Sequence, residues 1–317
     1  MKDLVSTISV APSWLWISFC VGIFVLLLID LSLFGKEAHK ISRKKALIES
    51  GIWISVALAF NLWFGFTYGK ELGLEFLTGY LVEKSLSIDN LFVILLIFSS
   101  FRIPDTHQHK VLFYGVLGAI VLRAFFIIVG AQLLHLFHWI LYVFGAILVI
   151  TAIKFLRETD EKIDAKENWS IRLLKRFIPT TTSFNGNHFF LVENGVRKAT
   201  PLFLALFVIE ITDLIFAVDS IPAVFAVTQD AFVAFASNIL AILGLRALYF
   251  VLADWVGKLR YLKPGLAAIL GFIGIKMLIM EFFKIPSWVS LLVIFSILTT
   301  AALSSWYVAR LEEKKLK

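Results

Sequence analysis

The chain has 317 residues, of which 59% are hydrophobic and 17% are charged, and its formal net charge is +7. In a typical soluble domain about a quarter of the residues are charged, so this composition excludes an ordinary soluble enzyme or binding domain. The positive charge does not indicate nucleic acid, because the basic residues gather in alternate loops between apolar segments. The single cysteine, Cys20, excludes an internal disulfide.

Apolar segments of about 20 residues recur along the chain, and a helix of that length crosses the hydrocarbon core of a bilayer. The alternating pattern of a membrane β-barrel is absent, so helices are expected to satisfy the backbone polar groups. We predict an all-α integral membrane protein with nine transmembrane helices, the first of them a retained span rather than a signal peptide. The predicted spans are 12–34, 46–68, 73–101, 110–134, 138–156, 199–227, 231–253, 264–283 and 286–309.

Basic residues predict the orientation. The stretches 35–45, 102–110, 157–198, 254–263 and 310–317 hold 22 Lys and Arg residues, whereas the opposite set of ends holds 3. Since loops rich in Lys and Arg stay in the cytoplasm, we expect the N-terminus outside and the C-terminus in the cytoplasm. The stretch 157–198 is interpreted as a cytoplasmic connector, with a hairpin turning at Asn194-Gly195.

Spans 3–5 resemble spans 6–8. Glu83 precedes Asp89-Asn90 as Asp213 precedes Asp219-Ser220, and Leu-Arg-Ala around Arg123 recurs around Arg246. Each unit has three spans, so the second must enter the membrane from the opposite side. An inverted repeat of this kind is typical of transporters, whose site lies where the repeats meet. A single membrane domain, 1–317, is therefore divided into peripheral helices (12–72), repeat unit 1 (73–156), the connector (157–198), repeat unit 2 (199–283) and a peripheral ninth helix (286–309).

One group of carboxyl side chains inside the predicted spans carries the chemistry, because an ionised group there costs at least ~2.5 kcal/mol. They are Glu83, Asp89, Glu210, Asp213 and Asp219. One interpretation is a cation site. The alternative is a set of structural ion pairs with Lys84, Arg123, Arg246 and Lys276, and neutralisation of Glu83 by its neighbour Lys84 is one such pair.

Neutral oxygens accompany these acids. Asn90, Thr212 and Ser220 lie beside them, and Pro222 is expected to interrupt the helix and free carbonyls near position 218, with an ordinary kink as the alternative. No histidine falls in the middle of a span. An oxygen-only set of ligands suits hard cations such as Mn²⁺, Mg²⁺ or Ca²⁺.

Three further charged residues receive local interpretations. Arg123 and Arg246 are either release switches that occupy the carboxylates when the metal leaves, or helix-to-helix pairing residues. Asp30, near the inner end of the first span, is expected to pair with a basic neighbour such as Lys36.

The segments from Glu83 to Asn90 and from Asp213 to Pro222 resemble the two signature segments of the TerC/Alx family of bacterial membrane proteins, and the resemblance extends from about Trp14 to Tyr307. It implies an inner-membrane protein tied to tellurite resistance by name and to manganese homeostasis and export by activity, and kinship with the LysE-type exporters. By match of motif it implies that Glu83, Asp89, Asn90, Glu210, Asp213 and Asp219 handle the metal. Tellurite is an anion, which an acidic site should repel.

The expected function is export of a divalent cation, Mn²⁺ first, by alternating access, with proton coupling as a hypothesis. The alternative is a non-transporting accessory membrane protein in tellurite resistance or in the response to envelope or pH stress. No nucleophile–base pair, phosphate loop or cofactor motif is present, so we expect neither enzymatic activity nor a bound cofactor, and the expected partners are the transported cation and the lipid bilayer.

Overall fold

The computed structural model describes residues 9–34, 43–157, 174, 176, 178–183, 186, 188–193, 195–252 and 261–315. Most of the predicted cytoplasmic connector, together with Lys36, lies outside these residues. The helices are α2 (Ser13–Phe34), α3 (Arg43–Tyr68), α4 (Lys70–Phe101), α5 (Asp105–Leu136), α6 (Ile140–Arg157), α8 (Pro201–Phe225), α9 (Ala231–Leu243), α10 (Leu245–Leu252), α11 (Leu262–Ile279) and α12 (Ser287–Lys315).

Long apolar helices dominate the fold, which confirms a multi-pass, all-α membrane protein. Over the described residues, seven helices are long and apolar enough to cross a membrane, and α9 with α10 makes an eighth if this pair, bent by 43°, counts as one span. The helix α4 is not among them. Its 32 residues reach far enough, about 48 Å at 1.5 Å per residue, but they include Lys70, Glu71, Glu75, Glu83, Lys84 and Asp89. The number of nine spans stays a prediction.

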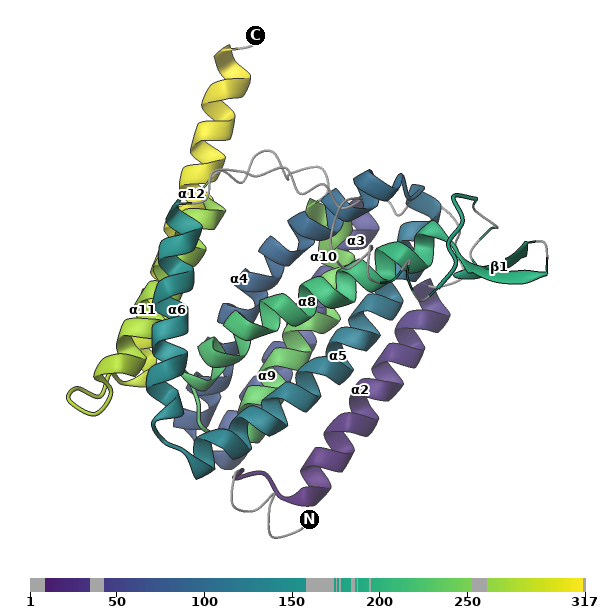
Figure 1. The fold of residues 1–317 in the computed structure, drawn as a ribbon. Helices are drawn as coiled ribbons and strands as arrows, with labels where there is room; N and C mark the ends of the chain where they lie inside the picture. The colour runs from purple at the N-terminus through teal and green to yellow at the C-terminus, as the bar shows by residue number, and fades with distance from the viewer. Residues whose placement is uncertain are drawn as a thin grey trace.

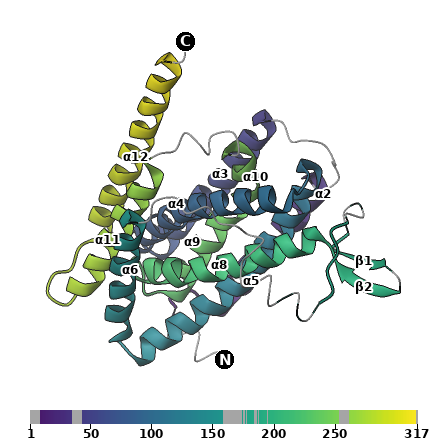
Figure 2. The same cartoon turned by 45° about the horizontal axis from the view of Figure 1, so that its top comes forward.

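The helices form a central bundle with three helices on one side of it, α6, α11 and α12, which we call the flank (Figures 1 and 2). In the middle, α4 packs on α9, α5 packs on α8, and α4 also packs on α8. On one side, α6 and α11 lie against each other along their lengths, and α12 packs on α11 and α4. The N-terminus and the loop between α11 and α12 lie at the lower end of the bundle in Figure 1, and the C-terminus lies at the upper end.

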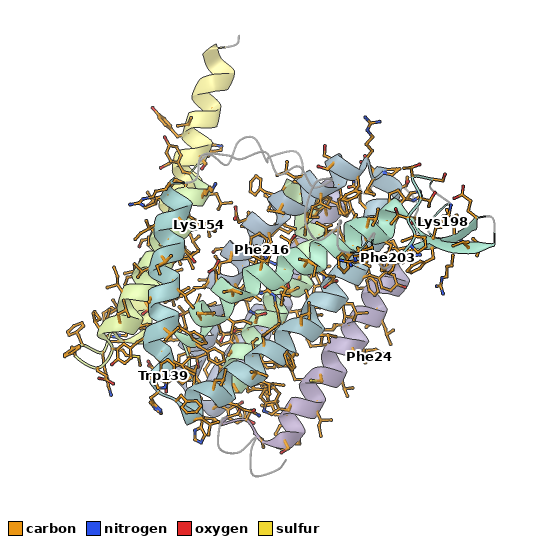
Figure 3. The ribbon with its side chains drawn as sticks, in the orientation of Figure 1. Phe24, Trp139, Lys154, Lys198, Phe203 and Phe216 are labelled. Atoms are coloured by element: carbon orange, nitrogen blue, oxygen red, sulfur yellow. The ribbon has the colours of Figure 1, made fainter. Side chains whose placement is uncertain are left out.

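Side chains on the outer faces of the helices are apolar, as lipid contact requires. Phe24 points away from the bundle on α2, and Trp139 lies at the lower end of α6 (Figure 3). A tryptophan at a helix end is typical of the membrane–water interface.

The predicted hairpin is confirmed by the strands β1 (Phe190–Glu193) and β2 (Val196–Ala199), which pair antiparallel with Glu193 opposite Val196. Gly195 has φ 75°, a left-handed conformation that glycine adopts without steric cost. Asn194 lies outside the described residues. The hairpin leads directly into α8 through Thr200, whose hydroxyl donates to the carbonyl oxygens of His188 and Phe189.

The predicted interruption at Pro222 is wrong. The helix α8 continues through Pro222 and ends at Phe225, because the missing proline N–H falls in the last turn, where few further helical bonds depend on it. The interruption lies in the next helix instead, at Gly244 between α9 and α10. Lys84 stabilises it by donating from Nζ to the carbonyl oxygen of Ala241 at 3.0 Å.

Two glycines allow α6 and α11 to approach closely. A Cβ placed on Gly274 would lie 2.8 Å from the carbonyl oxygen of Gly145 and 2.9 Å from Val149 Cγ2. Small residues at a helix contact are the usual means of close packing in membranes, where apolar side chains gain little by leaving lipid. The pair α6 and α11 is therefore held by backbone proximity.

Replacing Gly274 by alanine should lower the melting temperature, although alanine is the better helix former by about 1 kcal/mol. The added methyl group would overlap a backbone oxygen, and overpacking typically costs 1–3 kcal/mol. Gly22→Ala is the matched control, because a Cβ on Gly22 meets nothing within 4 Å and should leave the protein as stable or more stable. Thermal unfolding of the two purified variants in one detergent measures this. A Gly274→Ala variant as stable as Gly22→Ala would contradict the close contact.

Candidate cation site

A buried arginine lies at the centre of the bundle between two acids from different helices. Arg123 on α5 and Glu83 on α4 both have side chains that are 0% exposed, and Nη1 of the guanidinium bonds to Oε1 of Glu83. The same guanidinium donates from Nη2 to Asp213 Oδ1 on α8 at 2.8 Å and from Nε to Asp213 Oδ2 at 3.3 Å. A fixed guanidinium fork suits this two-point contact with a carboxylate.

Neutral oxygens complete the surroundings of the guanidinium. Nη1 of Arg123 lies 3.5 Å from Ser220 Oγ and 3.4 Å from Asn238 Oδ1. Asn238 on α9 also donates from Nδ2 to Glu83 Oε2 at 2.8 Å, and Ser87 donates to Glu83 Oε1 at 3.4 Å. We call Glu83, Arg123, Asp213, Ser220 and Asn238 the central cluster. Its carboxylate, hydroxyl and amide oxygens are the ligand types that hard divalent cations take.

Helical geometry explains which residues join the cluster. Positions seven apart on an α-helix lie about 20° from each other, whereas positions six apart differ by about 120°. Ser220 therefore shares a face with Asp213, and Asn90 shares a face with Glu83. Asp89 and Asp219, six residues after Glu83 and Asp213, must point elsewhere.

The structure brings the two remaining aspartates to the flank. Asp219 accepts a hydrogen bond from Thr151 on α6 at 2.7 Å and is attracted by Lys154 on the same helix. Asp89 is attracted by Lys263 at the start of α11. The six residues predicted to handle the metal thus divide between the cluster side and the flank.

Glu210 belongs to the cluster side. It lies one turn before Asp213, close enough for the two carboxylates to repel each other. Its carboxylate occupies the space that a side chain at Gly118 of α5 would need. A glycine at position 118 therefore lets α5 and α8 approach here with an acid between them.

A cavity reaches the cluster from one side. Its polar lining residues are Asn90, Thr212 and Asp213, and its apolar ones include Leu112, Phe216 and Leu245. It offers about 40 Å³ to water-sized molecules, enough for a few waters or one small ion. Two of the neutral residues predicted from the sequence, Asn90 and Thr212, therefore face a space that ends at Asp213.

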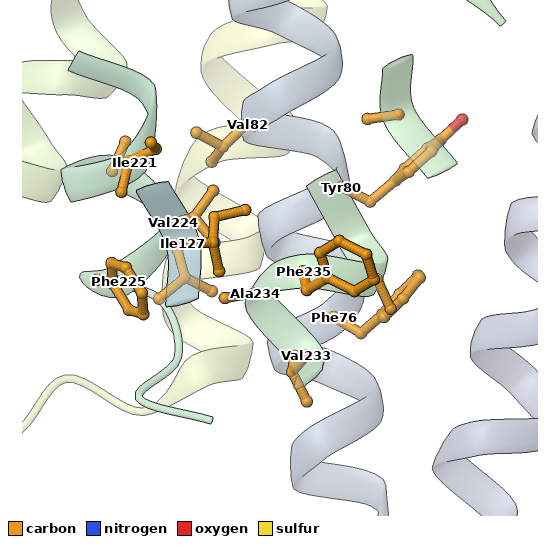
Figure 4. Close-up of a cluster of buried hydrophobic side chains, with 14 of the residues drawn as sticks. Phe76, Tyr80, Val82, Ile127, Ile221, Val224, Phe225, Val233, Ala234 and Phe235 are labelled. Carbon is orange, nitrogen blue, oxygen red and sulfur yellow. The ribbon is translucent and has the colours of Figure 1, made fainter. Parts of the chain in front are cut away.

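An apolar seal closes the other side of the cluster. It includes Phe76 on α4, Ile127 on α5, Phe225 on α8 and Phe235 on α9, all buried (Figure 4). Along each of these four helices the seal and the cavity lie on opposite sides of the cluster: on α4, for example, Phe76 precedes Glu83 and Asn90 follows it. The central cluster thus borders a cavity on one side and packed apolar side chains on the other.

The other basic residues of the spans have separate roles. Arg246 donates to Asp30 on α2 at 2.7 Å and lies 3.9 Å from Glu49 on α3, so Asp30 pairs with a distant arginine where the sequence had suggested Lys36. The alternative in which Lys84 neutralises Glu83 is not what the structure shows, since adjacent helical residues diverge by about 100° and Lys84 bonds to the carbonyl oxygen of Ala241. Lys276 is attracted by Glu75 and Glu71 at the start of α4.

Among the described residues, no three His, Cys, Asp or Glu side chains lie close enough to hold a metal ion. In this conformation the guanidinium of Arg123 lies between Glu83 and Asp213, the two acids that were expected to converge on a metal ion. The metal-binding role of the predicted residues therefore stays a prediction. Sequence reasoning missed Asn238. Its signal was present, because it is the one amide in the apolar run from Ala231 to Leu243, and a buried amide needs polar partners.

Comparison with known proteins gives the family. The sequence model described as "Integral membrane protein TerC family" matches residues 68–313. An "Uncharacterized membrane protein STKORF319" of Myxococcus xanthus is 48% identical over 302 residues, covering 95% of each chain. Proteins named "Putative membrane-bound redox modulator Alx" are 46% identical in Salmonella typhi, covering 98% of this chain and 99% of the relative, and 45% identical in Escherichia coli K12, covering 97% and 99%. No solved structure matches the chain.

The family match over most of the chain and the relatives of nearly equal length agree with the two signature segments that meet at Arg123, and the chain belongs to the TerC family of integral membrane proteins.

Proposed function

We propose that the protein exports a divalent cation, with Mn²⁺ as the first substrate, across a bacterial inner membrane. The observation that supports this most is the position of the central cluster between a cavity and an apolar seal. A transporter needs a site that one side of the membrane can reach while the other side is closed. With the N-terminus outside, as the basic loops predict, the cavity faces the cytoplasm, from which an exporter loads.

We also propose that the bundle is built from two inverted units, α4–α6 and α8–α11. In this relation α4 corresponds to α8, α5 to α9 and α6 to α11. The contact of α4 with α9 then corresponds to the contact of α8 with α5, and α6 packs against its own counterpart, α11. Such pairing is what a two-fold relation in the membrane plane would produce. Rocking of the two units about the cluster would then open the seal and close the cavity.

In this proposal Arg123 is the release switch. The cluster holds Glu83 and Asp213 around one positive charge, which leaves one net negative charge. A divalent cation in the same place would neutralise both carboxylates. Because the cation and the guanidinium compete for the same oxygens, loading would displace Arg123, and its return would expel the cation. Protons are the proposed coupling ions.

Asp89 and Asp219 have a second role in the proposal. Both lie beside basic residues near the flank helices, Lys263 and Lys154. We assign them to the route of the cation to and from the cluster. No catalytic activity and no resident cofactor are part of the proposal, and the partners are the cation and the lipid bilayer.

The first test uses Asp213→Asn. Cells lacking the protein should accumulate manganese under manganese load, and the wild-type gene should reverse this. Asp213→Asn keeps the shape of the side chain but removes one of the two charges that would balance the cation, so it should behave like the deletion. Cellular manganese measured by elemental analysis decides, with Asp105→Asn at the exposed start of α5 as control. Normal export by Asp213→Asn would refute the site.

The second test uses Arg123→Leu, with Arg246→Leu as the matched control. Loss of Arg123 leaves the buried carboxylate of Glu83 and the half-buried carboxylate of Asp213 without their counter-charge, and breaking a buried pair costs about 3–5 kcal/mol. Both variants should therefore melt below the wild type without metal. Mn²⁺ should stabilise Arg123→Leu by about 2.7 kcal/mol at 100 times its dissociation constant. At the same concentration it should stabilise Arg246→Leu less, because there the cation must first displace the guanidinium of Arg123. Equal responses of the two variants to Mn²⁺ in a thermal shift assay would contradict the exchange of guanidinium and cation.

The third test separates transport from an accessory role without transport. This role is the second candidate, because relatives of the chain are named as putative redox modulators. Purified protein in liposomes should move ⁵⁴Mn²⁺, and faster with an opposing proton gradient. Liposomes with Asp213→Asn serve as the control for leakage. Equal flux in the two preparations would favour the accessory role.

A further inference from the structure

We infer that Asn238 is a ligand of the transported cation and sets its preference for hard metals, an inference that rests on the proposed function. No predicted metal residue lies on α9, and every residue of that helix from Ala231 to Leu243 is buried. In this run of apolar side chains, Asn238 and Ser237 are the two polar ones. Burying an amide is unfavourable unless it is hydrogen-bonded, so its position calls for partners.

Those partners make the amide part of the cluster. Asn238 is 0% exposed, its Nδ2 donates to Glu83 Oε2 at 2.8 Å, and its Oδ1 accepts from Arg123 Nη1 at 3.4 Å. The amide oxygen thus already points at a positive charge. A cation that replaced the guanidinium would meet the same oxygen.

The second contact of Asn238 orients Glu83. Holding Oε2 leaves Oε1 directed at the guanidinium. The amide group therefore supplies one neutral oxygen and fixes one carboxylate oxygen toward the same point. With Glu83, Asp213 and Ser220, the cation would have oxygen ligands from α4, α8 and α9. Such a set suits Mn²⁺ or Mg²⁺, whereas a sulfur ligand in one place would favour a softer ion such as Cd²⁺.

The inference is tested by exchanging this one ligand for sulfur. In a Cys20→Ser background, which removes the native exposed thiol, Asn238→Cys is compared with Ser237→Cys. Ser237 is the neighbouring residue on α9, is also 0% exposed, and faces Gly79 rather than Arg123. Equilibrium dialysis of purified protein against ⁵⁴Mn²⁺ and ¹⁰⁹Cd²⁺ gives the ratio of the two affinities.

Asn238→Cys should raise the preference for Cd²⁺ over Mn²⁺ at least about tenfold relative to its background, and Ser237→Cys should leave it unchanged. The inference is overturned if both cysteine variants change the ratio equally, or if neither does. A background protein that binds no Mn²⁺ overturns the proposed function, and the inference with it. Binding of Mn²⁺ without the shift in Asn238→Cys overturns the inference alone.

A second variant serves if Asn238→Cys does not fold. Asn238→Ser keeps a hard oxygen, but its shorter side chain withdraws that oxygen from the cluster and gives up the amide bond to Glu83. Mn²⁺ should then bind at least about fivefold more weakly, with the preference over Cd²⁺ unchanged. Unaltered affinity for Mn²⁺ in Asn238→Ser would show that position 238 is not a ligand.

Discussion

The guanidinium of Arg123 is fully buried in the middle of a membrane protein, and much of the arrangement around it follows from that constraint. A charge in such a place is tolerated only when opposite charges and hydrogen bonds surround it. Glu83 and Asp213 supply the charges, and Asn238 and Ser220 supply further oxygens. Because these groups come from α4, α8 and α9, one arginine on α5 ties four helices together at a single level.

The sequence was enough to predict the helices and the acids that they carry. It was not enough to predict which acids point toward Arg123, because that depends on the helical period. The ranges of the predicted spans coincide with helices because apolar segments of that length have few other structures open to them in lipid. The division of the acids between the cluster and the flank was not predicted, because spacing along the chain was considered without direction. Glu83 and Asp89 recur as Asp213 and Asp219, and that recurrence indicated one pocket. Residues six positions apart are separated by about 120° around the helix, so Asp89 and Asp219 lie toward the flank.

The position of the broken helix was also misjudged, for a related reason. Proline is a stronger helix breaker than glycine, so the interruption was predicted at Pro222. Its effect depends on how much helix follows, and only Ala223, Val224 and Phe225 do. Gly244 carries a weaker signal but lies in the middle of a long apolar segment, where Lys84 from α4 satisfies a carbonyl oxygen of the preceding turn. That lysine is distant in sequence, so its contribution could not be inferred from the segment itself.

The two arginines that stand in similar Leu-Arg-Ala segments, Arg123 and Arg246, differ in their partners. Arg123 is bound by Glu83 on α4 and Asp213 on α8, whereas Arg246 is bound by Asp30 on α2 and Glu49 on α3. If both arginines competed for the central carboxylates, two positive charges would balance Glu83 and Asp213 and leave no charge for a cation to neutralise. Since α2 and α3 hold Arg246 away, the cluster keeps one net negative charge. In the proposed export, α2 and α3 would therefore contribute to cation attraction at a distance, through the arginine that they hold away from the centre.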